Sequence, residues 1–203
     1  MLKIKTLVVG PLGVNCYLVV DPEKSEGIII DPGAEGEKIL RAIKRAGANF
    51  KAIVNTHGHF DHSGADFLKV ELGIPLLLHK LELSLLKSAL TDQMMLLGFG
   101  PSEETPEPDG FLKEGDEVKF GMEKLIVWHT PGHTPGGICL VGKGLIFTGD
   151  TLFQDGVGRT DLEGGDDEQL NKSLKRILSL PPETIVYAGH GPSTTIENER
   201  HII

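Results

Sequence analysis

Residues 52–62 read Ala-Ile-Val-Asn-Thr-His-Gly-His-Phe-Asp-His, a short apolar run followed by a crowd of polar side chains. The apolar run predicts a strand. Four ligand-type residues follow it within six positions: His57, His59, Asp61 and His62. Gly58 has no side chain to obstruct a bend, so a turn here aims alternate imidazoles at one point. Imidazole and carboxylate groups together are ligands that suit zinc, iron or manganese. Three imidazoles and a carboxylate placed this close together make little sense unless a cation compensates them.

Three more potential ligands each follow a predicted strand. They are His133, Asp150 and His190, which come after the apolar runs 125–128, 145–148 and 184–187. Taken singly, each residue of this kind is more often a turn residue than a ligand. Taken together, four strand ends each offer a ligand, and loops at one sheet edge can converge. The sequence therefore predicts one metal site built from seven side chains.

The bulk properties indicate a globular protein, and we expect a single domain over residues 1–203. The formal net charge of -9 argues against nucleic acid as a main partner, because phosphate binding needs clustered Lys and Arg. Apolar stretches are all shorter than the roughly 18 residues of a membrane helix, so we expect no membrane partner. The only cysteines, Cys16 and Cys139, are isolated in apolar runs, which favours a cytoplasmic location.

Apolar runs separated by turns predict a mixed α/β (α+β) protein of two packed sheets with helices outside. Residues 1–9 alternate as a strand does. Further strands are expected at 15–20, 27–30, 51–54, 76–78, 117–120, 124–128, 137–141, 145–148 and 184–187. Helices are expected around 39–46, from near 61 to about 72, over 81–90, and after an N-cap at Asp166. Residues 91–110, rich in Gly, Pro and acidic side chains, predict a mobile lid or long loop.

The order of four motifs resembles that of the metallo-beta-lactamase superfamily over nearly the whole chain. The motifs are His-x-His-x-Asp-His, Gly-His-Thr, Thr-Gly-Asp and Gly-His-Gly. Within that family, the segments 15–18, 131–136 and 158–161 resemble the glyoxalase II-like (hydroxyacylglutathione hydrolase-like) branch. The resemblance implies a four-layer αββα sandwich. It also implies one metal ion on His57, His59 and His133, a second on Asp61, His62 and His190, and Asp150 bridging the two.

The resemblance implies two divalent cations, with zinc expected and iron or manganese as alternatives. Two cations about 3.5–4 Å apart share a water and lower its pKa from about 15.7 toward about 7. The metal-bridged hydroxide then attacks a carbonyl, with Asp61 and Asp150 as the catalytic carboxylates. A thioester fits, because a thiol with a pKa of about 8.5 leaves without a proton donor. The expected function is hydrolysis of small hydroxyacyl-thioesters such as S-lactoylglutathione.

Two residues are candidates for substrate binding. Arg159 lies near the position where glyoxalase II enzymes use a cation to hold a glutathione carboxylate, although a salt bridge with Asp161 or Asp155 is the alternative. Phe153 lines the pocket or belongs to the core. The chain resembles a short form of these enzymes without their helical C-terminal glutathione-binding region.

Three other functions stay open. A persulfide dioxygenase would hold one iron on His57, His133 and Asp150, residues that are also part of the seven-ligand set. A lactonase or phosphodiesterase would use the same hydroxide on another ester. A non-enzymatic metal-stabilised binding protein fits less well, because structural zinc sites close with four ligands, commonly cysteines.

Overall fold

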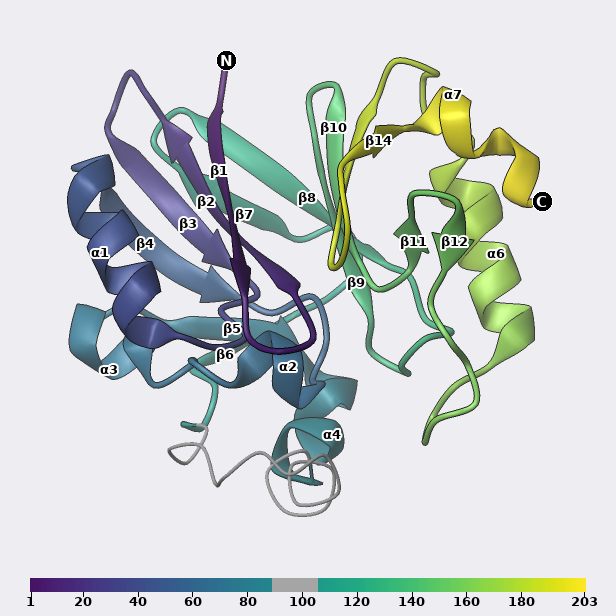
Figure 1. Cartoon of the computed structure of the whole chain (residues 1–203), viewed down its shortest axis with the longest axis horizontal. Coiled ribbons are helices and arrows are strands. Elements are labelled where there is room, and N and C mark those ends of the chain that lie inside the picture. The colour runs from purple at the N-terminus through teal and green to yellow at the C-terminus, as the bar shows by residue number, and fades with distance from the viewer. Residues whose placement is uncertain (89–105) are drawn as a thin grey trace.

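The fold consists of two six-stranded sheets that face each other (Figure 1). It is taken from a computed structural model, which describes residues 1–88 and 106–203. Within the described residues, no helix is long and apolar enough to cross a membrane.

The first sheet has the order β1-β2-β3-β4-β5-β6. Its strands are β1 (Lys3–Val9), β2 (Val14–Asp21), β3 (Glu26–Ile30), β4 (Asn49–Val54), β5 (Leu76–His79) and β6 (Gly110–Leu112). The first three are antiparallel, and β3 to β6 run parallel. Parallel strands β4 and β5 therefore end at the same edge of the sheet, which is where the histidine-rich stretch begins.

The second sheet has the order β14-β13-β10-β9-β8-β7. Its strands are β7 (Glu117–Phe120), β8 (Glu123–His129), β9 (Ile138–Gly142), β10 (Leu145–Gly149), β13 (Ile185–Ala188) and β14 (Thr194–Thr195). Strands β10 and β13 are parallel neighbours, so the loops that follow them leave from one edge. A separate ribbon pairs β11 (Leu152–Phe153) with β12 (Gly156–Val157).

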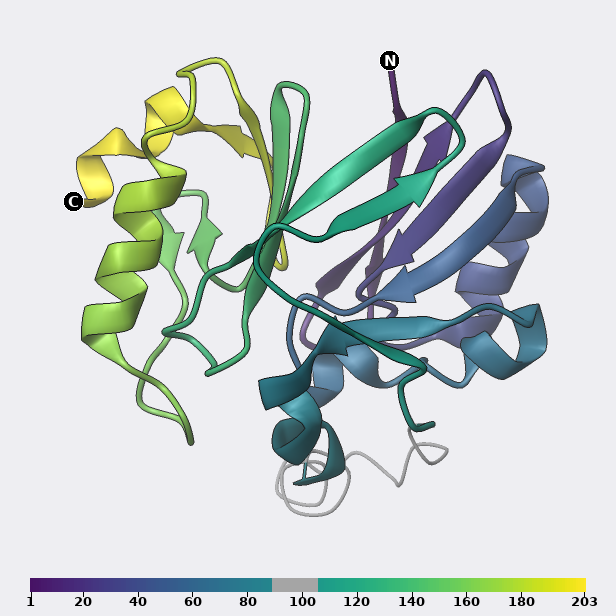
Figure 2. The same cartoon turned by 180° about the vertical axis from the view of Figure 1, so that it is seen from behind.

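Helices cover the outer face of each sheet (Figures 1 and 2). On the first sheet they are α1 (Gly36–Ala46) and α3 (Leu68–Leu72), and on the second they are α6 (Asp167–Ile177), α7 (Ile196–Glu199) and η3 (Arg200–Ile202). The short helices α2 (Phe60–Ser63), η1 (Lys80–Glu82) and α4 (Leu83–Ser88) lie instead at the edge where β4 and β5 end (Figure 1). Apolar residues of α1 and α3 pack on the first sheet, and those of α6 and α7 pack on the second. A third apolar cluster lies between the sheets. The predicted αββα sandwich is confirmed.

Aromatic rings help to hold the two sheets together. Tyr17 on β2 meets Phe147 on β10 edge to face, with 5.1 Å between ring centroids, and also contacts Tyr187 on β13. Phe147 is completely buried. The Tyr17 hydroxyl donates a hydrogen bond of 2.5 Å to the Ala188 carbonyl. The contact between sheets therefore reaches the strand end that precedes His190.

The predicted N-cap at Asp166 is confirmed, and the helix expected around 39–46 ends at a glycine. Gly47 ends α1 in the left-handed conformation, with φ 61°. Asp166 caps α6, because its Oδ1 accepts a hydrogen bond of 2.9 Å from the Gln169 amide.

The helix predicted from near Asp61 to about Leu72 is wrong as one element. The structure has two short helices there, α2 and α3. The amide of Ala65 donates to the carbonyl of Pro32 at 2.8 Å, outside the helix, so the helical hydrogen-bond ladder is interrupted.

The predicted helix over 81–90 begins as η1 and continues in α4 to residue 88. Most of the predicted lid at 91–110 lies outside the described residues. Its last residue, Gly110, instead begins the edge strand β6, which the sequence pattern did not predict.

We predict that Phe147→Ala lowers the free energy of unfolding by about 3–5 kcal/mol, because it leaves a cavity between the sheets. Urea denaturation measures this loss. The matched control is Phe111→Ala on edge strand β6, where the side chain is 47% exposed, and we expect a loss of about 0.5 kcal/mol or less. Equal losses in the two variants would contradict this account of the core.

Candidate metal centre

The structure brings all seven predicted ligands together at one edge of the sandwich. They come from five places: His57 and His59 after β4, Asp61 and His62 in α2, His133 after β8, Asp150 after β10 and His190 after β13. Both sheets therefore contribute. That these residues bind metal stays a prediction, but their predicted convergence is present in the fold.

His57, His59 and His133 form one set, with ligand atoms within 4.8 Å of one another. All three side chains are buried. His133 Nε2 lies 3.0 Å from His59 Nδ1, and the ring centroids of His57 and His59 are 4.8 Å apart at a steep angle. Three imidazoles held edge to face in this way present nitrogen atoms to a common point.

Asp61, His62 and His190 form a second set within the same limit. His190 Nε2 lies 3.4 Å from Asp61 Oδ2. Asp150 contacts both sets, because its Oδ2 lies 3.7 Å from His133 Nε2 and 3.5 Å from His190 Nε2. A carboxylate between two sets of ligands is the arrangement expected of a bridging ligand.

Several buried atoms of the cluster have no hydrogen-bond partner among the residues that the structure describes. They are the Nε2 atoms of His57, His59 and His62 and the Oδ1 of Asp150. A buried polar atom without a partner costs about 1–3 kcal/mol. A divalent cation would satisfy the lone pairs of His57, His62 and Asp150, and N and O donors are those that zinc, iron and manganese accept. The donor set therefore fits two cations.

Hydrogen bonds at the other ring nitrogen orient four of the imidazoles. In each case Nδ1 faces an oxygen atom at 2.7–3.1 Å. His57 faces Thr56 Oγ1, and His62 faces Asp31 Oδ2. His133 faces the Arg159 carbonyl, and His190 faces the Leu12 carbonyl. Each of these oxygens accepts a hydrogen bond from Nδ1–H, so the proton of the neutral ring stays on Nδ1. Nε2 is then left with a free lone pair, which is the form of histidine that binds metal.

Asp31 orients a candidate ligand, and the sequence pattern did not single it out. It is buried, and it accepts hydrogen bonds from the amide and the hydroxyl of Thr56, both at 2.7 Å. The same carboxylate holds His62. Its backbone has a φ of 51°, unusual for a residue other than glycine. The sequence shows only an aspartate between a strand and a turn. Its partners lie 25 and 31 residues away along the chain, so the sequence does not reveal these contacts.

Asn15 is a second residue whose role the sequence analysis missed. Its side-chain amide donates to the carbonyls of Ala188 and Gly191, at 3.0 and 2.8 Å, and so brackets the loop that carries His190. Residues 15–18 resemble a segment of the glyoxalase II-like branch, but the sequence does not indicate which loop they contact.

The two sets differ in their protonation. Burial lowers the pKa of His57 well below its ordinary value and that of His59 to about 4. Burial also opposes protonation of His62 and His190, but Asp150 and Asp61 outweigh it. They raise the pKa of His62 well above its ordinary value and that of His190 to about 9. Without a cation, protons on the second set therefore compensate the two carboxylates.

The predicted substrate-binding residues lie beside the cluster. The Arg159 side chain is exposed and donates from Nε and Nη2 to Asp161 at 2.7 Å, the salt bridge that was its alternative assignment. Its carbonyl holds His133, as described above. The Phe153 ring lies 6.0 Å from the His190 ring, centroid to centroid. Substrate binding by either residue stays a prediction.

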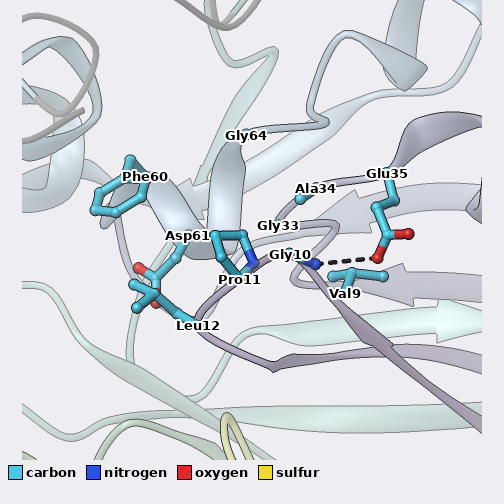
Figure 3. A pocket seen from close by; sticks show the side chains of 10 residues that line it. All are labelled: Val9, Gly10, Pro11, Leu12, Gly33, Ala34, Glu35, Phe60, Asp61 and Gly64. Atoms are coloured by element: carbon cyan, nitrogen blue, oxygen red, sulfur yellow. Dashed lines mark hydrogen bonds between the residues drawn. The ribbon is translucent and has the colours of Figure 1, made fainter. Parts of the chain in front are cut away.

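An apolar pocket of about 260 Å³ adjoins the second set of ligands (Figure 3). It lies between the β1–β2 turn, the loop after β3 and α2. Its lining residues are Val9, Gly10, Pro11, Leu12, Gly33, Ala34, Glu35, Phe60, Asp61 and Gly64. The Glu35 carboxylate is occupied by Lys38 and the Gly10 amide. Asp61 belongs both to the pocket lining and to the ligand cluster, so it connects the two.

Comparison with known proteins places this geometry in a family. The metallo-beta-lactamase superfamily profile matches residues 9–190. Hydroxyacylglutathione hydrolase GloC of Haemophilus influenzae is 39% identical over 191 residues, covering 92% of this chain and 89% of that protein. Among solved structures, BLEG-1 B3 metallo-beta-lactamase superposes with a TM-score of 0.90 at 38% identity, covering 98% and 97% of the two chains. TTHA1623 in a di-iron-bound form gives 0.88 at 42% identity and covers 96% of each chain.

We predict that protein stripped of metal loses stability as the pH rises. The folded pKa of His190 is raised from 6.5 to about 9. Its contribution to the free energy of unfolding is therefore fully present below about pH 6.5 and is lost as the pH rises through about 9. Urea midpoints measured in chelator across this range test the prediction.

His190→Gln in the same buffers is the control, and we expect a weaker pH dependence of its urea midpoint. Metal-loaded protein should lack the His190 contribution, because a bound cation replaces the proton. A urea midpoint of the stripped protein that stays constant over this range would contradict the prediction.

Proposed function

This chain belongs to the metallo-beta-lactamase superfamily, and from that premise we propose that it is a thioesterase dependent on two divalent metal ions. Its substrates would be small acyl- and hydroxyacyl-thioesters such as S-lactoylglutathione. The observation that carries the proposal is the pair of ligand sets with Asp150 between them, in which several buried donor atoms have no hydrogen-bond partner within residues 1–88 and 106–203.

The proposed ligands are His57, His59 and His133 for one ion, Asp61, His62 and His190 for the other, and Asp150 for both. When bound, such a pair lowers the pKa of a shared water and stabilises negative charge on the carbonyl oxygen. Zinc is the expected metal, with iron or manganese as alternatives.

The protein's own residues orient the ligands and handle protons. Asp31, the Arg159 carbonyl and the Leu12 carbonyl hold imidazoles in the tautomer with Nε2 free. Burial opposes ionisation of Asp61, but His62 and His190 lower its pKa below the ordinary value. Asp61 is thus ionised at the edge of the cluster, where it can bind the metal ion or receive a proton.

A thioester suits this arrangement because of its leaving group. A thiol with a pKa of about 8.5 departs as thiolate at neutral pH without a general acid, whereas the alkoxide of an ordinary ester needs a proton donor. Similarity to a hydroxyacylglutathione hydrolase over most of both chains supports the same substrate class.

The apolar pocket beside Asp61 supports a place for the acyl group. Val9, Pro11, Leu12 and Phe60 offer it apolar contacts. An acyl chain in this pocket would hold the carbonyl against the ligand cluster, and the thiol portion would extend toward the side of Phe153 and His190.

We predict that metal-loaded protein releases thiol from S-lactoylglutathione and that Asp150→Asn lowers kcat/KM by at least about 100-fold. Loss of a residue that only orients a ligand costs about 10–100-fold, so loss of a shared ligand should cost no less. Thiol release followed with a chromogenic disulfide measures both.

Three results would contradict the proposed function. One is the absence of thiol release from every acyl-thiol tested. Another is hydrolysis confined to a β-lactam, a lactone or a phosphodiester. The third is one equivalent of iron with oxygen uptake on glutathione persulfide, which would indicate a dioxygenase.

We predict that kcat/KM rises with acyl length from acetyl to butyryl by up to about fourfold per methylene, because burying a methylene contributes about 0.8 kcal/mol. Ala34→Leu, which fills part of the pocket, should flatten this series and leave acetyl-thioester hydrolysis close to that of the unmodified protein. Ala46→Leu, at the exposed end of α1, is the control and should retain the slope. A slope that survives Ala34→Leu would exclude the pocket as the acyl site.

A further inference from the structure

Glu82 is a buried acidic residue that belongs to neither ligand set. It ends η1, the short helix that follows β5, and its side chain has no exposure to solvent. Burial raises the pKa of this carboxyl above its ordinary value. A buried carboxyl group is costly unless it has partners, so its contacts indicate why it is there.

The carboxyl group of Glu82 accepts one hydrogen bond from each of two ligand loops. The Gly58 amide donates to Oε2 at 2.6 Å, and the Gly136 amide donates to Oε1 at 2.5 Å. Gly58 stands between His57 and His59, whereas Gly136 stands three residues after His133. One side chain therefore joins the loop after β4 in the first sheet to the loop after β8 in the second.

The close approach of Glu82 also accounts for glycine at both positions. A Cβ at Gly58 would lie 2.8 Å from the Glu82 carbonyl oxygen and 3.2 Å from its Oε2. A Cβ at Gly136 would lie 2.7 Å from Glu82 Oε1. Both glycines thus leave room for the same acidic residue, and Gly136 leaves room for the His79 ring as well, whose Nδ1 would lie 2.7 Å from a Cβ there.

We propose that Glu82 is a positioning residue that sets the distance between the His57–His59 pair and His133, and so the affinity of that set for its cation. The inference rests on the part of the proposed function that assigns these three histidines to a metal ion. It does not depend on which substrate is hydrolysed.

The experiment compares Glu82→Gln with unmodified protein. Glutamine keeps the shape but places an NH2 donor against a backbone N–H, so one buried donor loses its acceptor. We expect the affinity for Co²⁺, measured by titration in competition with a chelator, to fall by about 10–100-fold, the range found when residues that orient metal ligands are changed. The visible absorption spectrum of bound Co²⁺ should change as well, because the ligand geometry is altered.

Asp21→Asn is the matched control. Asp21 is also buried, and its two oxygens accept hydrogen bonds from the Glu23 and Met122 amides at 2.9 and 2.8 Å. It lies at the end of β2 remote from Asn15, about 20 Å along the strand. We expect both Asp21→Asn and Glu82→Gln to lower the urea midpoint. Only Asp21→Asn is expected to leave the Co²⁺ affinity and the absorption spectrum unchanged. A purely structural role for Glu82 would make the two variants alike in every measurement.

Co²⁺ affinity and spectrum unchanged in Glu82→Gln would overturn the proposal, even if the unmodified protein hydrolyses thioesters. Weakened Co²⁺ binding in a protein that hydrolyses no thioester would support the proposal and contradict only the substrate assignment. If Glu82→Gln does not fold, Glu82→Asp takes its place, since it keeps the charge but withdraws the carboxylate by one methylene. We expect weaker Co²⁺ binding in that variant too, and unchanged binding would again overturn the proposal.

Discussion

The site buries carboxylate oxygens and imidazole nitrogens that face one another. These atoms need positive charge, supplied by protons or by cations, and the other contacts of the site hold them in place for it. Asp61 and Asp150 lie among the histidines, and in the absence of a cation their charge is met by protons on His62 and His190. The other set is different, because burial keeps His57 and His59 neutral. A site with free lone pairs on one side and exchangeable protons on the other is suited to receive cations.

The sandwich supplies this arrangement through contacts that cross between the sheets. Tyr17 on the first sheet bonds to the strand end before His190 on the second, and Glu82 bonds to one ligand loop from each sheet. The spacing of the ligands therefore depends on how the two sheets pack. Changes to the contacts between sheets at the ligand edge, such as that of Tyr17 with Ala188, are expected to alter metal affinity.

Much of the fold, and the convergence of the seven candidate ligands, could be predicted from the sequence, because their signals are local. Short apolar runs mark strands, and ligand-type residues such as His57 and Asp150 follow them within a few positions. The residues that orient the ligands could not be predicted in this way. Asp31 bonds to residues 25 and 31 positions away and Glu82 to a residue 54 positions away, so only the folded chain brings these partners together. The break between α2 and α3 has the same cause, since the Ala65 amide bonds to Pro32.

The most direct test of two cation sites is a crystal structure of the protein as purified, with anomalous diffraction data collected on both sides of the zinc and iron absorption edges. The account predicts two anomalous peaks, one among His57, His59 and His133 and the other among Asp61, His62 and His190, with Asp150 between them. A single peak held by His57, His133 and Asp150, or no peak within the cluster, would contradict it.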